Sequence, residues 1–410
     1  MVVAHKSKSK KALLLENIDK IAIDKLSAAG FEVDARPYAM SEEDLTAELG
    51  KGFSLLGIRS KTKITEKSLS KASALTCIGA FCIGVNQIDQ NACTKRGIAA
   101  FNAPYSNTRS VVEIVMGQII MLMRKATAKH MLLQKGIWDK SANGCYEVRG
   151  KTLGIVGYGN IGSQLSVVAE SFGMKVQYFD IAEKLTLGNA TKLNTLQELL
   201  VSSDIVTLHV DGRKSNQNLI SEKQLSQMKK GSYLINYSRG NVVDLDDLAL
   251  YIQKEHIAGA ALDVFPNEPK STGELFLSPL RTFPNVLLTP HIGGSTKEAQ
   301  KNIGEFVAER FLQYLSKGDT TLSVNFPNIR LEKPIGASTR IVHIHKNVPG
   351  MLAEINKIFA KRKINILGQA LGTNNEIGYA VVDIGGKISD KVFDEVKNIR
   401  NTIIARRVGL

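Results

Sequence analysis

Apolar and polar positions alternate along the first hundred residues in a way that predicts short buried strands separated by helices. Apolar runs at 31–33, 55–58, 77–80 and 98–101 have the length of strands buried on both faces. Between them, Ser41-Glu42-Glu43-Asp44 is typical of a helix start, and Gly30 stands where a helix would end. Strands that alternate with helices predict a parallel sheet flanked by helices.

A second series of the same kind begins at Lys151, after an apolar helix expected over 110–125 and a polar stretch that reaches Gly150. Strands are expected at 152–156, 176–180, 205–209, 233–237, 258–264 and 286–289. A helix from Ser295 to about Leu315 should follow. We therefore expect a second α/β unit.

The last seventy or so residues predict a different order of strands and helices. Strands are expected at 340–345, 366–371, 379–384 and 402–408, and helices at 349–360 and 389–399. The resulting order, βαββαβ, is that of a ferredoxin-like unit. The chain as a whole is thus predicted to be an α/β protein of several parts, as its 410 residues also suggest.

Composition narrows the class of protein. Apolar residues make up 43% of the chain, and no run approaches the roughly 20 apolar residues of a membrane span. We expect a cytoplasmic protein with no membrane partner. A formal charge of +14 can indicate a nucleic-acid-binding protein. Here, however, Lys and Arg are scattered among acidic residues, and no basic stripe rich in aromatic residues accompanies them. We expect no nucleic-acid partner, and instead a field that attracts small anions.

The four cysteines, at positions 77, 82, 93 and 145, form no CxxC pair and have no histidine at ligand spacing. We expect no metal site, and buried free thiols in a reducing compartment.

A glycine-rich turn follows the strand expected at 152–156. It reads Gly157-Tyr158-Gly159-Asn160-Ile161-Gly162, in which the glycines allow a tight turn, close approach of a pyrophosphate and close helix packing. Asp180 ends the next strand, where its carboxylate can bind ribose hydroxyls and repel a 2′-phosphate. The pattern predicts NAD rather than NADP. The alternative is a structural glycine turn with a solvated aspartate.

Three polar residues follow later strands of this unit, at the edge where ligands of open α/β sheets bind. Arg239 offers a planar fork for a carboxylate, and His291 can exchange a hydroxyl proton near neutral pH. Glu268, if bonded to the second ring nitrogen, would fix the tautomer and favour the protonated imidazole. Each residue alone is more often structural. Together with the glycine-rich turn, the three predict oxidation or reduction of a hydroxy acid.

These motifs resemble the D-isomer-specific 2-hydroxy acid dehydrogenase family. The match lies in 157–162, 236–240, 261–269 and 289–294. The resemblance implies that Arg239 binds the substrate carboxylate, that His291 is the acid/base and that Glu268 tunes it. Further expected dinucleotide contacts are His209, Ser238, Asp263, Gly293 and Gly294.

The family also implies a discontinuous layout. A flavodoxin-like substrate-binding domain would comprise 1–106 and 294–335, with a Rossmann-type NAD-binding domain, 107–293, inserted into it. Residues 336–410 resemble an ACT domain, an amino-acid-sensing module, in their βαββαβ order and in His345-x-Asn347-x-Pro349-Gly350.

A narrower resemblance is to the members that oxidise 3-phosphoglycerate in L-serine biosynthesis, carried by 81–87, 101–110 and 291–300. It implies that Arg59, Ser60, Asn107 and Gln300 line the substrate pocket. From the residues alone, Arg59 and Lys61 could equally form a solvated strand end.

The same resemblance implies feedback by L-serine, bound by His345 and Asn347 of one chain and Asn365 of its neighbour. A dimerisation module without ligand is the alternative. It further implies a homotetramer, with the segment around Trp138 reaching a neighbouring subunit; equally, Trp138 could belong to the core. Other possibilities are a hydroxypyruvate, glyoxylate or 2-oxoglutarate reductase, and an NAD-sensing co-repressor on the same fold.

Overall fold

The computed structural model describes residues 10–269, 273–332 and 338–408. The chain forms two compact units: one comprises Met1–Ser106 and Gln300–Leu410, and the other Asn107–Ala299. The predicted domain boundaries remain predictions, and the one at 335/336 falls outside the described residues.

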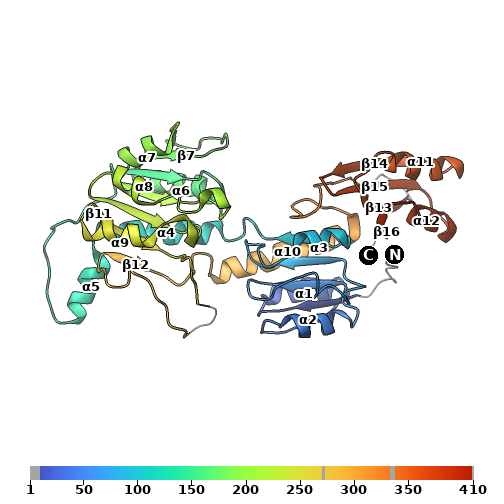
Figure 1. The fold of residues 1–410 in the computed structure, drawn as a ribbon, viewed down its shortest axis with the longest axis horizontal. Coiled ribbons are helices and arrows are strands. Elements are labelled where there is room, and N and C mark those ends of the chain that lie inside the picture. Colours follow the sequence, from blue (N-terminus) through green and yellow to red (C-terminus); the bar gives the residue numbers. More distant parts are fainter. Residues whose placement is uncertain (1–9, 270–272, 333–337, 409–410) are drawn as a thin grey trace. The chain divides into compact units, whose positions relative to one another are not determined.

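The first unit contains a five-stranded parallel sheet of order β2-β1-β3-β4-β5, drawn in blue to cyan in Figure 1. The alternation of strands and helices predicted the parallel sheet, and this strand order is the doubly wound, flavodoxin-like one that the family resemblance implied. Strands β3, β4 and β5 are buried along their whole length, which explains their continuous apolar runs. The expectation of a buried strand at 31–33 is wrong in this respect, because β2 lies at the edge of the sheet and buries none of its residues. The elements are β1 (Lys11–Leu14), α1 (Lys20–Ala28), β2 (Glu32–Ala35), α2 (Glu42–Leu49), β3 (Leu55–Ile58), β4 (Cys77–Ala80), α3 (Gln90–Lys95) and β5 (Ala99–Asn102).

The second unit is built on a seven-stranded parallel sheet of order β12-β11-β10-β9-β6-β7-β8, with helices α4, α6, α7, α8 and α9 around it (Figure 1). This is a Rossmann-type sheet, in which β7 and β8 lie on one side of β6 and β9 to β12 lie on the other. Its elements are α4 (Thr108–Met123), α5 (Ala126–Gln134), β6 (Thr152–Val156), α6 (Asn160–Ser171), β7 (Lys175–Phe179), β8 (Thr191–Lys192), α7 (Leu196–Ser202), β9 (Ile205–Leu208), η1 (Lys214–Asn216), α8 (Glu222–Gln227), β10 (Ser232–Asn236), η2 (Gly240–Val242), α9 (Leu245–Gln253), β11 (Ile257–Leu262) and β12 (Val286–Leu288).

Helix α10 (Lys297–Lys317) returns the chain to the first unit, whose second sheet is antiparallel and has the order β14-β15-β13-β16. This confirms the predicted ferredoxin-like unit. One face, with Ile341 and Val382, packs on α11 and α12. The other, with Val342 and Tyr379, joins Phe311 of α10 in a common core. The elements are β13 (Ser338–Lys346), α11 (Met351–Lys361), β14 (Ile366–Thr373), β15 (Ile377–Gly385), α12 (Asp390–Lys397) and β16 (Thr402–Val408).

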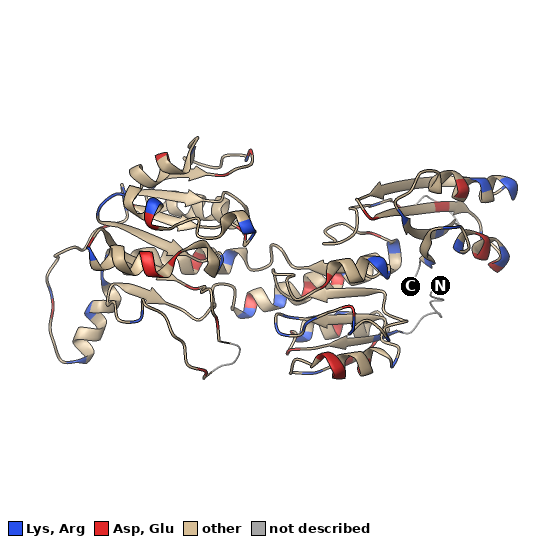
Figure 2. Cartoon of the chain, in the orientation of Figure 1, with Lys and Arg blue, Asp and Glu red and all other residues tan. Residues whose placement is uncertain are grey.

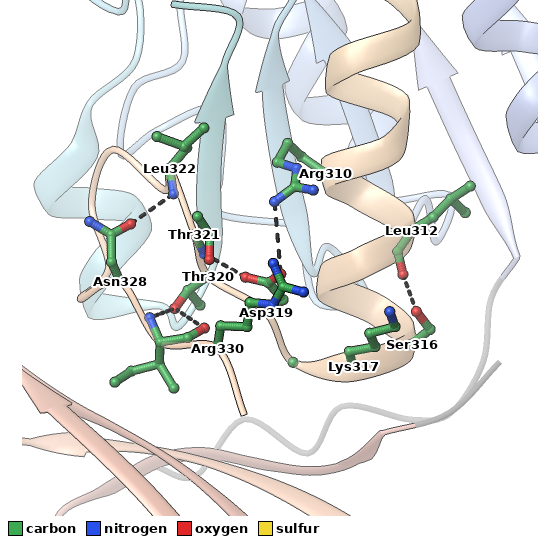
Figure 3. A network of polar contacts seen from close by, with 12 residues as sticks. Arg310, Leu312, Ser316, Lys317, Asp319, Thr320, Thr321, Leu322, Asn328 and Arg330 are labelled. Atoms are coloured by element: carbon green, nitrogen blue, oxygen red, sulfur yellow. Dashed lines mark hydrogen bonds and ion pairs between the residues drawn. The ribbon is translucent and has the colours of Figure 1, made fainter. Parts of the chain in front are cut away.

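The loop after α10 is folded by polar contacts of its own side chains (Figure 3). Asp319 accepts a hydrogen bond from the Thr321 amide at 2.8 Å and lies 3.8 Å from Arg310 of α10. Asn328 accepts one from the Leu322 amide at 2.7 Å. These bonds satisfy backbone amides that no sheet or helix pairs, so residues 319–330 take a defined path.

Three further expectations from the sequence differ from the structure. The polar stretch after α4 contains a helix, α5, which forms without burying any residue and therefore gives no apolar stripe. Trp138 does not belong to a core of this chain, because 78% of it is exposed. Of the four free cysteines, Cys77 and Cys93 are buried as expected, whereas Cys82 and Cys145 are only partly buried.

Basic and acidic residues are interspersed along the helices and loops of both units (Figure 2). Among the described residues, no helix combines the length and the apolar character needed to cross a membrane.

Candidate active site

The carboxylate of Asp263 organises the loop that follows β12. It is 2% exposed and follows β11, the neighbouring strand. One oxygen accepts the Thr289 hydroxyl at 2.6 Å and the Ile292 amide at 2.8 Å, and the other accepts the Gly293 amide at 2.7 Å. Burial raises its pKa, although these donors act to lower it. Asp263 therefore holds the loop around His291, a role that the sequence did not reveal.

His291 is held in an unusual backbone conformation by this loop. Its φ of +54° lies in the left-handed region, which few residues other than glycine adopt. Its amide donates to the carbonyls of Asp263 at 2.8 Å and Thr289 at 3.0 Å, which fixes that conformation. Backbone outliers of this kind concentrate at functional sites, because the surrounding structure must stabilise them.

The structure brings His291 and Glu268 into contact. The imidazole Nδ1 lies 2.8 Å from a Glu268 carboxylate oxygen, and the other oxygen accepts the Phe265 amide at 3.1 Å. The hydrogen bond to Glu268 raises the pKa of His291 and outweighs its partial burial. Burial acts to raise the pKa of Glu268, but the bond to His291 and the Phe265 amide leave it lowered. The half-exposed imidazole thus keeps Nε2 for another partner.

Arg239 follows β10, and the next residue, Gly240, lies against the loop that carries Glu268. Its positive charge acts to lower the pKa of both His291 and Glu268, so the three groups are electrostatically linked. The turn is held by Asn236, whose side-chain nitrogen donates to the Arg239 carbonyl at 3.0 Å. Gly240 has no room for a side chain, since a Cβ would lie 2.0 Å from the Phe265 carbonyl carbon. The glycine therefore permits the close approach of the two loops.

The glycine-rich turn between β6 and α6 has the geometry of a phosphate-binding loop. Gly157 has a φ of +93°, and a Cβ on it would lie 2.8 Å from the His209 backbone. A Cβ on Gly162 would lie 2.4 Å from the Gly157 carbonyl oxygen. By contrast, a Cβ on Gly159 would meet nothing within 4 Å, and this residue caps α6 without a side-chain bond. The helix N-terminus is therefore open to an anion, as a dinucleotide requires.

Asp180, which directly follows β7, accepts hydrogen bonds from nearby backbone amides. Its carboxylate accepts the amides of Tyr158 and Ala182, both at 2.8 Å. These bonds fix the carboxylate beside the glycine-rich turn. The Tyr158 ring stacks on Tyr178 at a centroid distance of 3.8 Å, which anchors the turn to the sheet.

The remaining predicted dinucleotide contacts surround this region within the same unit. Ser238 is 5% exposed and donates its hydroxyl to Asn236 at 2.8 Å. His209 bonds Thr207 through Nε2 at 2.9 Å, whereas its buried Nδ1 makes no hydrogen bond to the described residues. Burial lowers the pKa of His209 to about 3, so the ring is neutral. Gly294 lies against Asn107, since a Cβ there would meet the Asn107 amide nitrogen at 2.2 Å.

The predicted substrate residues are divided between the two units: Arg59, Ser60 and Gln300 belong to the first and Asn107 to the second. Arg59 follows β3, and its guanidinium makes one long bond, 3.5 Å, to the Glu16 carbonyl. The Glu16 carboxylate accepts the amides of Lys61 at 3.0 Å and Thr62 at 2.7 Å. Sequence reasoning missed Glu16, a 7% exposed acid that shapes the Arg59 loop.

The predicted effector residues occupy both ends of the antiparallel sheet. His345 is the penultimate residue of β13 and lies opposite Gly378, and Asn347, which follows the strand, donates to the Asn374 carbonyl at 2.7 Å. Asn365 precedes β14, where that strand pairs with the far end of β15. His345 and Asn365 of one chain therefore stand at opposite ends of the sheet.

Comparison with known proteins gives the family. Residues 116–293 match the model for the NAD binding domain of D-isomer specific 2-hydroxyacid dehydrogenases. A D-3-phosphoglycerate dehydrogenase of Haemophilus influenzae is 48% identical over 97% of this chain and 96% of its own length. The chain belongs to the D-isomer specific 2-hydroxyacid dehydrogenase family. It is an NAD-dependent enzyme of that family, with Gly157–Gly162 in the matched domain.

Further similarities agree with this family. The D-3-phosphoglycerate dehydrogenase of Escherichia coli strain K12 is 46% identical over 97% of both chains. Residues 341–404 match the model of an AHAS small subunit-like ACT domain, as the βαββαβ order predicted. The D-lactate dehydrogenase of Aquifex aeolicus, solved with NAD and lactic acid, is 27% identical, with a TM-score of 0.66 over 77% of this chain and 100% of its own.

Proposed function

We propose that this dehydrogenase oxidises D-3-phosphoglycerate to 3-phosphohydroxypyruvate with NAD, the first step of L-serine biosynthesis. Relatives named for this substrate match nearly the whole chain, including the C-terminal ACT domain. The observation that carries the chemistry is the bond between His291 and Glu268, within electrostatic reach of Arg239.

The chemistry of the three residues follows from their protonation. Neutral His291 accepts the hydroxyl proton at Nε2 as the alcohol becomes a ketone, and Glu268 stabilises the resulting imidazolium. Arg239 binds the substrate carboxylate and polarises the neighbouring oxygen. NAD, when bound, supplies the hydride acceptor. In the reverse direction, protonated His291 donates to the carbonyl oxygen.

The residues expected at the nucleotide are consistent with NAD. Gly157, Gly159 and Gly162 leave the α6 N-terminus open to a pyrophosphate. We place the ribose at Asp180, and the further contacts at His209, Ser238, Asp263, Gly293 and Gly294.

At the other end of the substrate, we assign the phosphate to Arg59 and Ser60, with Asn107 and Gln300 completing the pocket. The long bond of Arg59 to a carbonyl leaves its guanidinium free to bind a stronger, charged acceptor.

We further propose that L-serine binds the ACT domain and inhibits the enzyme. His345 and Asn347 of one chain would meet Asn365 of a neighbour, because within one chain they stand at opposite ends of the sheet. A homotetramer in the cytoplasm, with the exposed Trp138 segment at a subunit contact, completes the proposal.

The test of substrate assignment is steady-state NADH oxidation with 3-phosphohydroxypyruvate and with hydroxypyruvate. Loss of a charge-assisted bond should raise the KM of the Arg59→Gln variant for the phosphorylated substrate about tenfold or more. The matched control is Lys61→Gln, which removes the same charge two residues away and should change KM less than about threefold. Equal effects of the two substitutions, or equal use of hydroxypyruvate by the wild type, would contradict the assignment.

A further inference from the structure

Two histidines lie in the apolar core of the ACT domain. His343 and His345 are 0% and 2% exposed and project from β13 on the same face as Ile341, toward α11 and α12. Polar groups in such a core cost stability unless they are hydrogen-bonded. The dehydrogenase mechanism does not use either ring.

The two rings are bonded to each other, and the His343 ring also bonds one hydroxyl and the Val396 backbone. The His345 ring also interacts with the His343 backbone. Nδ1 of His343 lies 3.1 Å from Nδ1 of His345, and Nε2 of His343 lies 2.9 Å from the Thr402 hydroxyl. Nε2 of His345 has no hydrogen-bond partner among the described residues, yet it is not among the polar atoms sealed from solvent. Among the described residues, this series of side-chain hydrogen bonds from Thr402 therefore ends at His345, whose Nε2 is left for another partner.

A bulge in β16 places the Thr402 hydroxyl beside His343, at the start of this series of hydrogen bonds. The pairing of β13 with β16 runs from Ile344 opposite Ile404 to His345 opposite Thr402, so Ile403 is an extra residue in β16. Bulges of this kind re-aim side chains and are frequent beside functional sites. Gly378, opposite His345, has no side chain to displace the ring, since a Cβ would lie 2.2 Å from Nε2.

The number of protons on the two rings links the role of the Thr402 hydroxyl to the role of His345 Nε2. Burial lowers the pKa of both histidines, so each ring is neutral and carries one proton. The bond between the two Nδ1 atoms holds one proton, and the second must then reside on one outer nitrogen. If Thr402 donates to His343, His345 Nε2 is a donor for a carboxylate or hydroxyl. If Thr402 accepts, His345 Nε2 is an acceptor for an ammonium group.

We infer that Thr402 and His343 are positioning residues for the effector: their hydrogen bonds orient the His345 imidazole and set which role its Nε2 plays toward L-serine. The inference rests on the proposed function, which places the effector at His345. It adds the two residues that determine how His345 binds.

The test uses the full-length enzyme and the L-serine concentration that halves its turnover. Thr402→Val removes the hydroxyl while keeping the side-chain shape and should raise that concentration about threefold to tenfold. Thr402→Ser keeps the hydroxyl and should stay within about twofold of the wild type. Thermal unfolding and turnover without serine are measured for each, and Thr402→Ala serves as a second hydroxyl-free variant.

The outcomes separate the two claims. A wild type that serine does not inhibit would overturn the effector proposal, and this inference with it. A wild type that serine inhibits, with the valine and alanine variants as sensitive as the serine variant, would overturn the positioning role alone. Reduced sensitivity in valine and alanine but not in serine supports it, because a packing defect would not be rescued by the smaller hydroxyl residue.

Discussion

His291 combines a chemical and a conformational requirement at one position. Its imidazole bonds Glu268, while its backbone occupies the left-handed region at φ +54°. Histidine and asparagine tolerate this region better than most residues, whereas alanine is strained there by roughly 1 kcal/mol. Substitutions at this residue can therefore separate the proton-transfer role from the stability of the loop.

His291→Asn should abolish proton transfer and keep the backbone, lowering kcat by about 10²–10⁴-fold with little change in Tm. His291→Ala should lose the same activity and also lower Tm, since it adds backbone strain. Steady-state rates and thermal unfolding of both variants check this. An asparagine variant with near-wild-type kcat would rule out His291 as the acid/base.

Glu268 should set the pH range of the reaction through His291. Reduction of the oxo acid needs the protonated imidazole, so its rate falls as pH rises through the His291 pKa. That pKa is raised by the bond to Glu268, and Glu268→Gln should shift the fall to lower pH. The measurement is kcat/KM for reduction against pH; an unmoved profile would contradict the coupling.

The bond between His291 and Glu268 also makes the stability of the folded protein depend on pH. The raised pKa of His291 contributes stability that is present below the imidazole's unfolded value, about 6.5, and is lost as pH rises through the folded pKa. Because about half of the side chain is exposed, solvent screens this contribution.

At the scale of elements, the turn between β6 and α6 contains glycines with different duties. Gly162 sits where a Cβ would lie 2.4 Å from a backbone oxygen, whereas Gly159 faces open space with a φ of −81° that any residue adopts. One glycine thus serves packing of the helix on the strand. The other leaves room for the ligand.

Gly159→Ala should therefore fold normally but raise the KM for NAD about tenfold or more, which corresponds to 1.4 kcal/mol. Gly162→Ala should instead be destabilised by roughly 1–3 kcal/mol, because backbone must move to admit the methyl group. Coenzyme titration and chemical unfolding of both variants distinguish these effects. An unchanged KM for Gly159→Ala would show that the pyrophosphate does not approach this residue.

The elements themselves were largely predictable because their apolar patterns are strong. Strands β3, β4 and β6 begin and end at the predicted residues, since all three are buried along nearly their whole length. Helix α5 was missed, because it buries no residue. Trp138 was not predictable either, because its apolar character does not show whether the fold covers it, and 78% of it is exposed.

At the scale of the molecule, the sequence identified the chemical groups of the site but not what holds them. Arg239, Glu268 and His291 stood out because each follows a strand of one parallel sheet. The support from Asp263 and Glu16 was not predictable, since both act through bonds to backbone amides distant in sequence. The Thr402–His343–His345 chain depends on a bulge that no local pattern reveals.

The central claim is that His291 transfers the proton in oxidation of a phosphorylated D-hydroxy acid. The most direct measurement is the initial rate of NAD reduction with D-3-phosphoglycerate and with D-glycerate, for the wild type and His291→Asn. The account predicts a kcat/KM at least about a hundredfold higher for the phosphorylated substrate, from two or more charge-assisted bonds, and loss of turnover in the variant. Equal use of D-glycerate, or an active asparagine variant, would contradict it.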